Sequence, residues 1–125
     1  MSNFTSGELE RARRVVDVVS VQNRYNVADR SSDAVLAACE RDGIVFIPWS
    51  PLSQNPREAA HGARVRLASW ATGRGVSVPQ ALVAWLLARS PVILPIPGTA
   101  NVGHLEENWA ARSLRLTPGE LRALE

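Results

Sequence analysis

Residues 92–108 read V-I-L-P-I-P-G-T-A-N-V-G-H-L-E-E-N, and this stretch decides the fold more than any other part of the chain. An apolar, β-branched run stops at Pro95-Ile96-Pro97 and predicts a strand. Gly98-Thr99 predicts a tight turn, and Asn101 predicts the cap of a helix. A strand that feeds a helix in this way leaves backbone N–H groups unpaired at the positive end of the helix dipole, which suits a phosphate. By itself the stretch fits equally well a plain connection in an α/β domain that binds nothing.

The composition is that of one soluble globular domain: 125 residues, 46% hydrophobic and 21% charged. The longest uncharged apolar run, residues 81–88, is too short to span a bilayer. The first residues lack the basic and apolar pattern of a signal peptide. We therefore expect a cytoplasmic protein that does not associate with membranes.

All 14 basic residues are arginine, so no lysine is present to act as a base or a Schiff-base nucleophile. The net charge is only +2, and the one arginine cluster, residues 11–14, shares its predicted helix with Glu8 and Glu10. This pattern indicates a solvated helix face, and nucleic acid is a poor candidate partner.

The cysteine and histidine content predicts no metal site. Cys39 is the only cysteine and lies in an apolar run, which indicates a buried thiol. His61 and His104 are far apart, and neither has a second His or Cys at ligand spacing.

Strands and helices are predicted to alternate along the chain. Thr5 and Glu8 have capping-box spacing, and Gly43 and Gly75 mark helix ends. Strands are expected at residues 18–22, 44–47 (ending at Pro48) and 92–96, and helices at 5–15, 32–41, 56–74, 77–89, 101–111 and from 117 onward.

Alternating strands and helices favour a parallel α/β architecture. The strands are continuously apolar, so we expect both faces of the sheet to be covered. Three strands do not close a barrel, and a sheet of three parallel strands has two open edges, so the chain reads as part of something larger.

Four motifs, in order, resemble those of the aldo-keto reductases, which are NADPH-dependent oxidoreductases built on an eight-stranded β/α barrel. They are S-N-F at 2–4, V-Q-N-R-Y-N at 21–26, I-P-W-S-P-L at 47–52 and P-I-P-G-T with H-L-E-E-N at 95–108. The resemblance implies a partial (β/α)8 TIM barrel made of the last three strand–helix units plus C-terminal helices. It makes residues 1–125 the C-terminal, cofactor-binding part of such a domain.

The resemblance also implies a site for NADP(H). Ser2, Asn3 and Gln22 match residues that hold the nicotinamide carboxamide, and Trp49 matches the aromatic that stacks on the nicotinamide ring. An end-of-strand hydrogen bond for Gln22 and a core position for Trp49 are the alternatives. The remaining matched positions line the pyrophosphate (Ser50, Pro51, Leu52, Ser53), meet the adenosine phosphate (Gly98, Thr99, Ala100, His104) or contact the adenine (Glu107, Asn108).

The chain departs from the family in three respects. Gly98 and His104 stand where the family usually places a basic side chain for the 2′-phosphate, which leaves the choice between NADPH and NADH open. The family's catalytic Asp, Tyr, Lys and His come from its N-terminal half, and the only tyrosine here, Tyr25, matches a different position. Met1 stands where the family has a valine, which suggests a truncated gene, a frame-shifted remnant or a start assigned inside a longer reading frame.

Three hypotheses follow. The chain is the NADPH-binding half of an aldo-keto reductase, inactive until joined to a separate N-terminal half. Alternatively, it is a non-catalytic module that binds a nucleotide or a protein, with self-association through its open sheet edges. The third hypothesis is a gene remnant without function.

Overall fold

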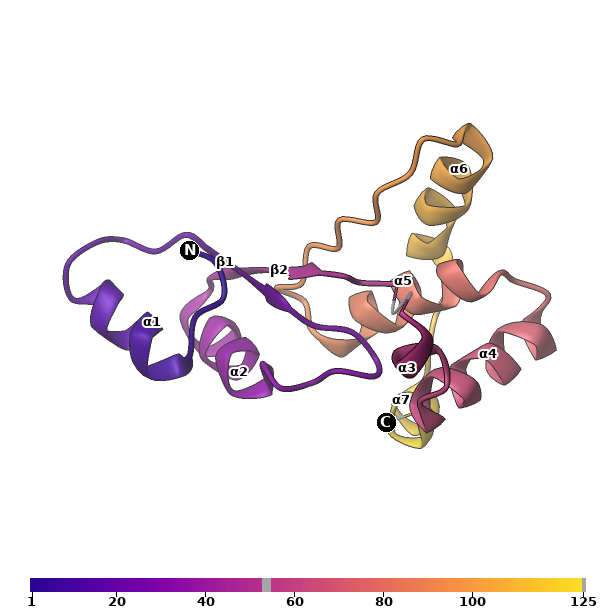
Figure 1. The fold of residues 1–125 in the computed structure, drawn as a ribbon, viewed down its shortest axis with the longest axis horizontal. Coiled ribbons are helices and arrows are strands. Elements are labelled where there is room, and N and C mark those ends of the chain that lie inside the picture. The colour runs from indigo at the N-terminus through magenta and orange to yellow at the C-terminus, as the bar shows by residue number, and fades with distance from the viewer. Residues whose placement is uncertain (53–54, 125) are drawn as a thin grey trace.

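A computed structural model describes residues 1–52 and 55–124 (Figure 1). Its elements in chain order are α1 (Ser6–Arg13), β1 (Ser20–Arg24), α2 (Asp33–Asp42), β2 (Val45–Trp49), α3 (Pro56–Ala59), α4 (Gly62–Arg74), α5 (Val78–Arg89), α6 (Val102–Ala110), the 3₁₀ turn η1 (Ala111–Ser113) and α7 (Pro118–Leu124). Within the described ranges, no helix has the length and apolar character needed to cross a membrane.

The helix ends lie where local chemistry predicts them. Thr5 and Ser77 each form a complete capping box, at the starts of α1 and α5, and Asn101 accepts from the His104 N–H at the start of α6. Gly43 and Gly75 end α2 and α4 with φ of 66° and 65°, a left-handed conformation that side chains disfavour. The predicted caps are therefore confirmed.

The helix predicted over 56–74 is two helices. Asn55 caps α3, and a second start follows at once because His61 adopts an extended conformation and its Nδ1 accepts from the Ala63 N–H at 3.3 Å. A histidine that acts as an N-cap gives a weaker sequence signal than Ser, Thr, Asp or Asn.

The sheet holds two parallel strands, β1 and β2, with Gln22 opposite Ile47 and Arg24 opposite Trp49. Both strands lie about two residues further along the chain than predicted, and β2 runs through Pro48. Even-numbered residues of β2 direct their N–H away from β1, toward the chain after α5, as Phe46 does to Val92 O at 2.9 Å. Pro48 is the next β2 residue with this orientation, and it has no N–H with which to continue the pairing.

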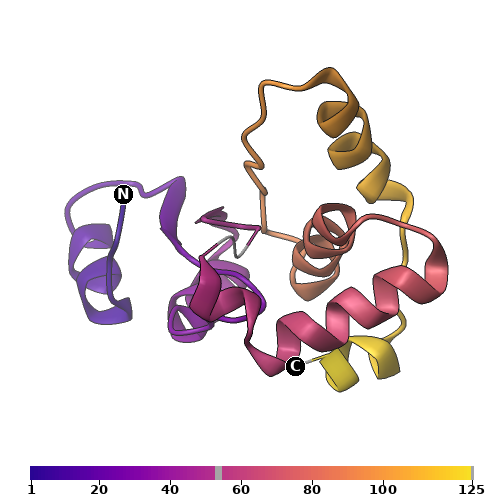
Figure 2. The same ribbon diagram turned by 45° about the vertical axis from the view of Figure 1, so that its right-hand side comes forward.

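The third predicted strand, 92–96, is reduced to a bridge between Phe46 and Ile93. Its pairing consists of the Phe46 N–H donating to Val92 O and the Leu94 N–H donating to Phe46 O at 2.8 Å. The next donor in this ladder would be the N–H of residue 48, which Pro48 lacks, whereas Pro95 and Pro97 stand at positions whose nitrogens face away from β2. The chain then runs in extended form to α6, which stands apart from the sheet (Figures 1 and 2).

The prediction that both faces of the sheet are covered is wrong for the described residues. Burial alternates along both strands, because α2 and α5 supply a core to one face only. On that face Tyr25 packs edge-on against Phe46 at 5.6 Å and stacks on Trp85 at 5.9 Å between ring centroids. The opposite face, which carries Gln22 and Trp49, is left half-exposed.

Candidate functional site

The first part of the site lies where the N-terminal segment meets the end of β1. Gln22 donates its N–H to Met1 O at 2.7 Å and accepts from the Asn3 N–H at 2.9 Å, which places Ser2 and Asn3 beside it. The side-chain amide of Gln22 makes no hydrogen bond to another residue in the described part of the chain. Its donor and acceptor are thus both available to a ligand amide.

Trp49 is held beside this group at the end of β2. Its indole Nε1 donates to Asn3 Oδ1 at 2.8 Å, and the Arg24 guanidinium lies 4.9 Å from the ring centroid. Asn3, which accepts this hydrogen bond, and Ser50, which follows Trp49, adopt left-handed backbone conformations with φ of 56° and 55°. Such values are uncommon outside glycine and cluster at ligand sites.

Arg24 is itself clamped by two carboxylates. Its Nε donates to Asp29 Oδ2 at 2.9 Å, and its terminal nitrogen pairs with Glu58 Oε1, which also accepts from Asn26 Nδ2 at 3.2 Å. The hydrogen bond to Glu58 raises the pKa of Arg24 above its ordinary value. Burial works to raise the pKa of Asp29, but hydrogen bonds from Ser31 and the charge of Arg24 outweigh it, so this pKa lies below its usual range.

The second part of the site is a cleft of about 390 Å³ between the N-terminal ends of α5 and α6. Its lining residues are Leu52, Ser77, Pro79, Gly98, Thr99, His104, Glu107 and Asn108. Within it, Thr99 Oγ1 accepts from the Asn101 N–H at 3.1 Å and lies 3.5 Å from His104 Nδ1. Ser77 donates its hydroxyl to Glu107 Oε2 at 2.8 Å, so the two helices are joined across the cleft.

Among the described residues, the ionisable side chains that line this cleft are His104 and Glu107, and no described lining residue is an arginine. A phosphate here would therefore be held by backbone and hydroxyl donors, with at most one cationic side chain. The charge of Glu107 opposes an anion at close range.

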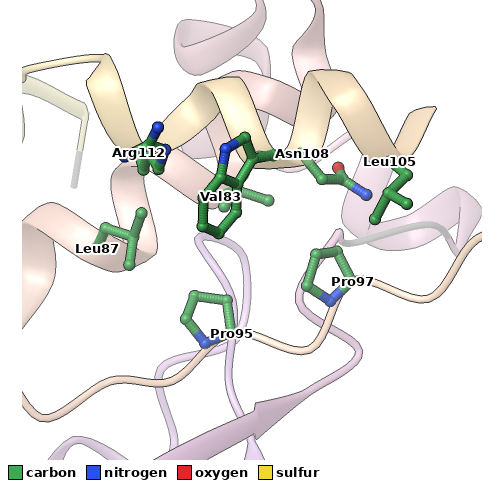
Figure 3. A pocket seen from close by; sticks show the side chains of 8 residues that line it. Val83, Leu87, Pro95, Pro97, Leu105, Asn108 and Arg112 are labelled. Atoms are coloured by element: carbon green, nitrogen blue, oxygen red, sulfur yellow. The ribbon is translucent and has the colours of Figure 1, made fainter. Parts of the chain in front are cut away.

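A second, apolar hollow of about 310 Å³ lies between α5, the extended segment and α6. In Figure 3, Val83, Pro95, Pro97 and Leu105 face it, and Arg112 lies at one end beside Leu87. Several of the apolar side chains around it are exposed: Leu105 to 60%, Leu87 to 39% and the adjoining Trp109 to 66%.

Comparison with known proteins decides the family. The sequence model described as "Aldo/keto reductase family" matches residues 1–125, which is the whole chain. The chain belongs to the aldo/keto reductase family.

Pyridoxine 4-dehydrogenase of Escherichia coli is 40% identical over 126 residues, which cover 100% of this chain and 42% of that protein. An oxidoreductase of Schizosaccharomyces pombe is 42% identical over 117 residues, which cover 94% of this chain and 37% of the relative. The chain thus spans about two fifths of the length of the curated relatives it matches.

Solved structures show the same partial match. An aldo-keto reductase from Klebsiella pneumoniae in complex with NADPH superposes with a TM-score of 0.85 at 29% identity, covering 98% of this chain and 45% of that one. A thermostable aldo-keto reductase in complex with the inhibitor epalrestat has a TM-score of 0.85 at 30% identity, with the same two coverages. The chain therefore has the α/β fold of the corresponding part of these aldo-keto reductases.

Most residues matched to the reductase cofactor site fall into the two groups described above. Ser2, Asn3, Gln22 and Trp49 form the first, and Leu52, Gly98, Thr99, His104, Glu107 and Asn108 line the cleft. Ser50 accepts from Asn26 through its carbonyl and Pro51 is buried. Ala100 is exposed and does not line the cleft, and Ser53 lies outside the described residues.

Sequence reasoning missed three residues of this region. Ser77 and Pro79 line the cleft, and Arg24 stands behind Trp49. The sequence predicted a helix over 77–89, but nothing local indicates that its start lies beside Glu107. Arg24 falls inside the V-Q-N-R-Y-N motif without a role being attached to it.

The only tyrosine in this aldo-keto reductase chain belongs to the core. Tyr25 is fully buried, and its hydroxyl donates to Asp33 Oδ1 at 2.6 Å, on the face of the sheet that carries the helices. Burial raises the pKa of Tyr25, and the hydrogen bond to Asp33 adds to this effect. The hydroxyl therefore lies on the opposite side of the sheet from Trp49.

Proposed function

We propose that residues 1–125 form the C-terminal, cofactor-binding part of an aldo-keto reductase domain and bind NADP(H). The observation that carries this proposal is the cleft in which Leu52, three residues after the end of β2, meets the matched residues of segment 98–108. The known complexes of Klebsiella pneumoniae aldo-keto reductases with NADP and NADPH support it.

In this proposal, Trp49 stacks on the nicotinamide, and the amides of Asn3 and Gln22, with Ser2, orient its carboxamide. The Asn3 acceptor already binds Trp49, so its Nδ2 is the group offered to the ligand. Residues 50–53 follow the pyrophosphate, and Gly98, Thr99 and Ala100 meet the adenosine phosphate with His104. Glu107 and Asn108 contact the adenine, with Glu107 oriented by Ser77.

When bound, the nicotinamide carries the hydride exchanged with a carbonyl or alcohol. The residues of this chain hold and orient the ring, and they supply no proton donor for the carbonyl oxygen. Lysine is absent from the sequence, and the Tyr25 hydroxyl is committed to Asp33 in the core. We infer that turnover requires an acid from another segment or polypeptide, and that these 125 residues alone bind cofactor without reducing a substrate.

The cleft predicts only weak discrimination between NADPH and NADH. A 2′-phosphate gains its largest stabilisation from arginine or lysine, and neither is among the described residues that line the cleft. Backbone N–H groups and the Thr99 hydroxyl are available to both cofactors. We therefore expect the two dissociation constants to lie within about tenfold, which corresponds to about 1.4 kcal/mol.

A calorimetric titration of the purified chain with NADPH tests the proposal. Replacing both Glu107 and Asn108 with Ala should weaken binding about tenfold or more, because two polar contacts to the adenine are lost. Glu106→Ala is the matched control, since Glu106 is the exposed neighbour that does not line the cleft. Absence of NADPH binding by the unmodified chain, or equal loss in Glu106→Ala, would overturn the assignment.

Association with another polypeptide is a second candidate, favoured by a specific observation. Leu105 and Trp109, which line the apolar hollow, and Leu94 and Ile96 on the extended segment are all exposed apolar side chains, and such side chains are typical of surfaces that bind another protein. The partner would be a second copy of this chain, or an N-terminal half of an aldo-keto reductase barrel. Sedimentation of the purified chain distinguishes the first case, because a monomer at every concentration excludes self-association.

A further inference from the structure

We propose that Arg24 is a positioning residue that fixes Trp49 as a one-sided platform for a planar ligand ring. The inference rests on the proposed function, because it concerns the nicotinamide end of the same site. Arg24 and Trp49 are opposite each other in the parallel register, so their side chains leave the sheet on the same face. Both belong to the face that the helices leave half-exposed.

Two contacts fix the indole. Its edge is held by the hydrogen bond from Nε1 to Asn3 Oδ1 at 2.8 Å, and one ring face is covered by the guanidinium, whose Cζ lies 4.9 Å from the ring centroid. A guanidinium stacks favourably on an indole through cation–π attraction. The ring is thereby restricted to one orientation, and only its other face is left for stacking.

The guanidinium is itself immobilised, which distinguishes it from an ordinary surface arginine. It uses Nε for Asp29 and a terminal nitrogen for Glu58, whose side chain is only 10% exposed. Glu58 belongs to α3, and Asn26, which shares its Oε1, also donates to Ser50 O at 3.0 Å. The cluster therefore joins the ends of both strands and α3 behind the ring, and holds the guanidinium in place before a ligand arrives.

A planar ligand then binds more tightly, because the indole is already ordered and binding does not carry the entropic cost of ordering it. Substituting Arg24 should weaken the binding of ligands that stack on Trp49 and spare those that occupy only the cleft near Glu107. NADPH reaches both regions, whereas adenosine 2′,5′-bisphosphate lacks the nicotinamide and reaches only the cleft. The ratio of the two affinities separates positioning of Trp49 from general damage to the fold.

The test measures dissociation constants of both ligands for the chain and its variants. For Arg24→Met, we expect the NADPH constant to rise about fivefold and the bisphosphate constant to change by less than about twofold. In a Trp49→Ala background, Arg24→Met should have no further effect, because the residue acts through the ring. Arg24→Lys keeps a cation behind the indole but loses the planar group that pairs with both carboxylates, so it should recover only part of the NADPH affinity.

Arg74→Met is the matched control. Arg74 also lies over a tryptophan, Trp70, at 4.5 Å and pairs with a glutamate, Glu120, but away from the site. It should leave both dissociation constants unchanged while costing a similar loss in stability.

Three results overturn the inference. They are NADPH binding by Arg24→Met that is as tight as that of the unmodified chain, an equal weakening of both ligands, and an equally strong effect in the Trp49→Ala background, which would mean direct contact with the ligand. Failure of the unmodified chain to bind either ligand would instead overturn the proposed function, and this inference with it. If Arg24→Met does not fold, Arg24→Lys decides: affinity no better than that of Trp49→Ala refutes the role.

Discussion

The Ser77 hydroxyl serves two structures at once, and its removal is the most informative stability test. It accepts from the Gln80 N–H at 3.3 Å as the N-cap of α5, and it donates to Glu107 Oε2 at 2.8 Å on α6. Loss of a serine N-cap costs about 1 kcal/mol. Loss of a hydrogen bond to a half-exposed carboxylate costs about 1 kcal/mol more. We therefore expect Ser77→Ala to lower the free energy of unfolding by about 2 kcal/mol.

A double-mutant cycle separates the two contributions. Glu107→Ala removes the bond between the helices and leaves the cap, so it should cost about 1 kcal/mol. The double variant Ser77→Ala/Glu107→Ala should cost about 2 kcal/mol, less than the sum of the single costs, which gives a coupling energy of about 1 kcal/mol. Gln80→Ala is the control, because it breaks the capping box only and should not couple to Glu107.

Urea unfolding, monitored by circular dichroism and by tryptophan fluorescence, measures the free energy of unfolding of each variant. Coincident transitions and equal slopes are needed before the free energies are compared. Additive costs for Ser77 and Glu107 would refute the reasoning, because the hydroxyl would then stabilise α5 alone. The same variants connect stability to binding. Ser77→Ala should also weaken the binding of NADPH about threefold, since Glu107 loses the donor that orients it.

Three further predictions concern residues outside the cleft. Several hydrogen bonds lower the pKa of Glu120 to about 2, and the largest contribution comes from the backbone N–H of Thr117. The ionised Glu120 therefore stabilises the fold fully above about pH 5, and this stabilisation is lost as the pH falls toward 2. Glu120→Gln should flatten the fall of the urea unfolding midpoint at acid pH, and an unchanged fall contradicts the assignment. Tyr25→Phe removes the hydrogen bond to Asp33 and should cost about 1 kcal/mol with no change in NADPH affinity, whereas a selective loss of affinity would place Tyr25 in the site. Cys39 is fully buried, and burial raises the pKa of its thiol, so a thiol reagent should modify it only after unfolding; fast modification of the native chain would disprove this packing.

The sequence determined the features that depend on a few neighbouring residues. The capping box at Thr5, the glycines that end helices at 43 and 75, and the Asn101 cap all stand where the local pattern predicts them. Each involves hydrogen bonds or backbone angles within about one turn of helix, so no distant contact can change them. The same holds for His104, Glu107 and Asn108, which share a helix face because of their spacing and line one cleft.

Only the tertiary structure decided which segments meet. The strand predicted at 92–96 is reduced to one bridge, because Pro48 on β2 lacks the N–H that would extend the pairing beyond Leu94. Ser77 lies beside Glu107, and Arg24 behind Trp49, through contacts that join residues 30 and 25 positions apart in the chain. Such proximity depends on helix packing and strand register, which local sequence patterns do not encode. The cleft residues were therefore foreseeable one by one from the family motifs, whereas the side chains that position them were not.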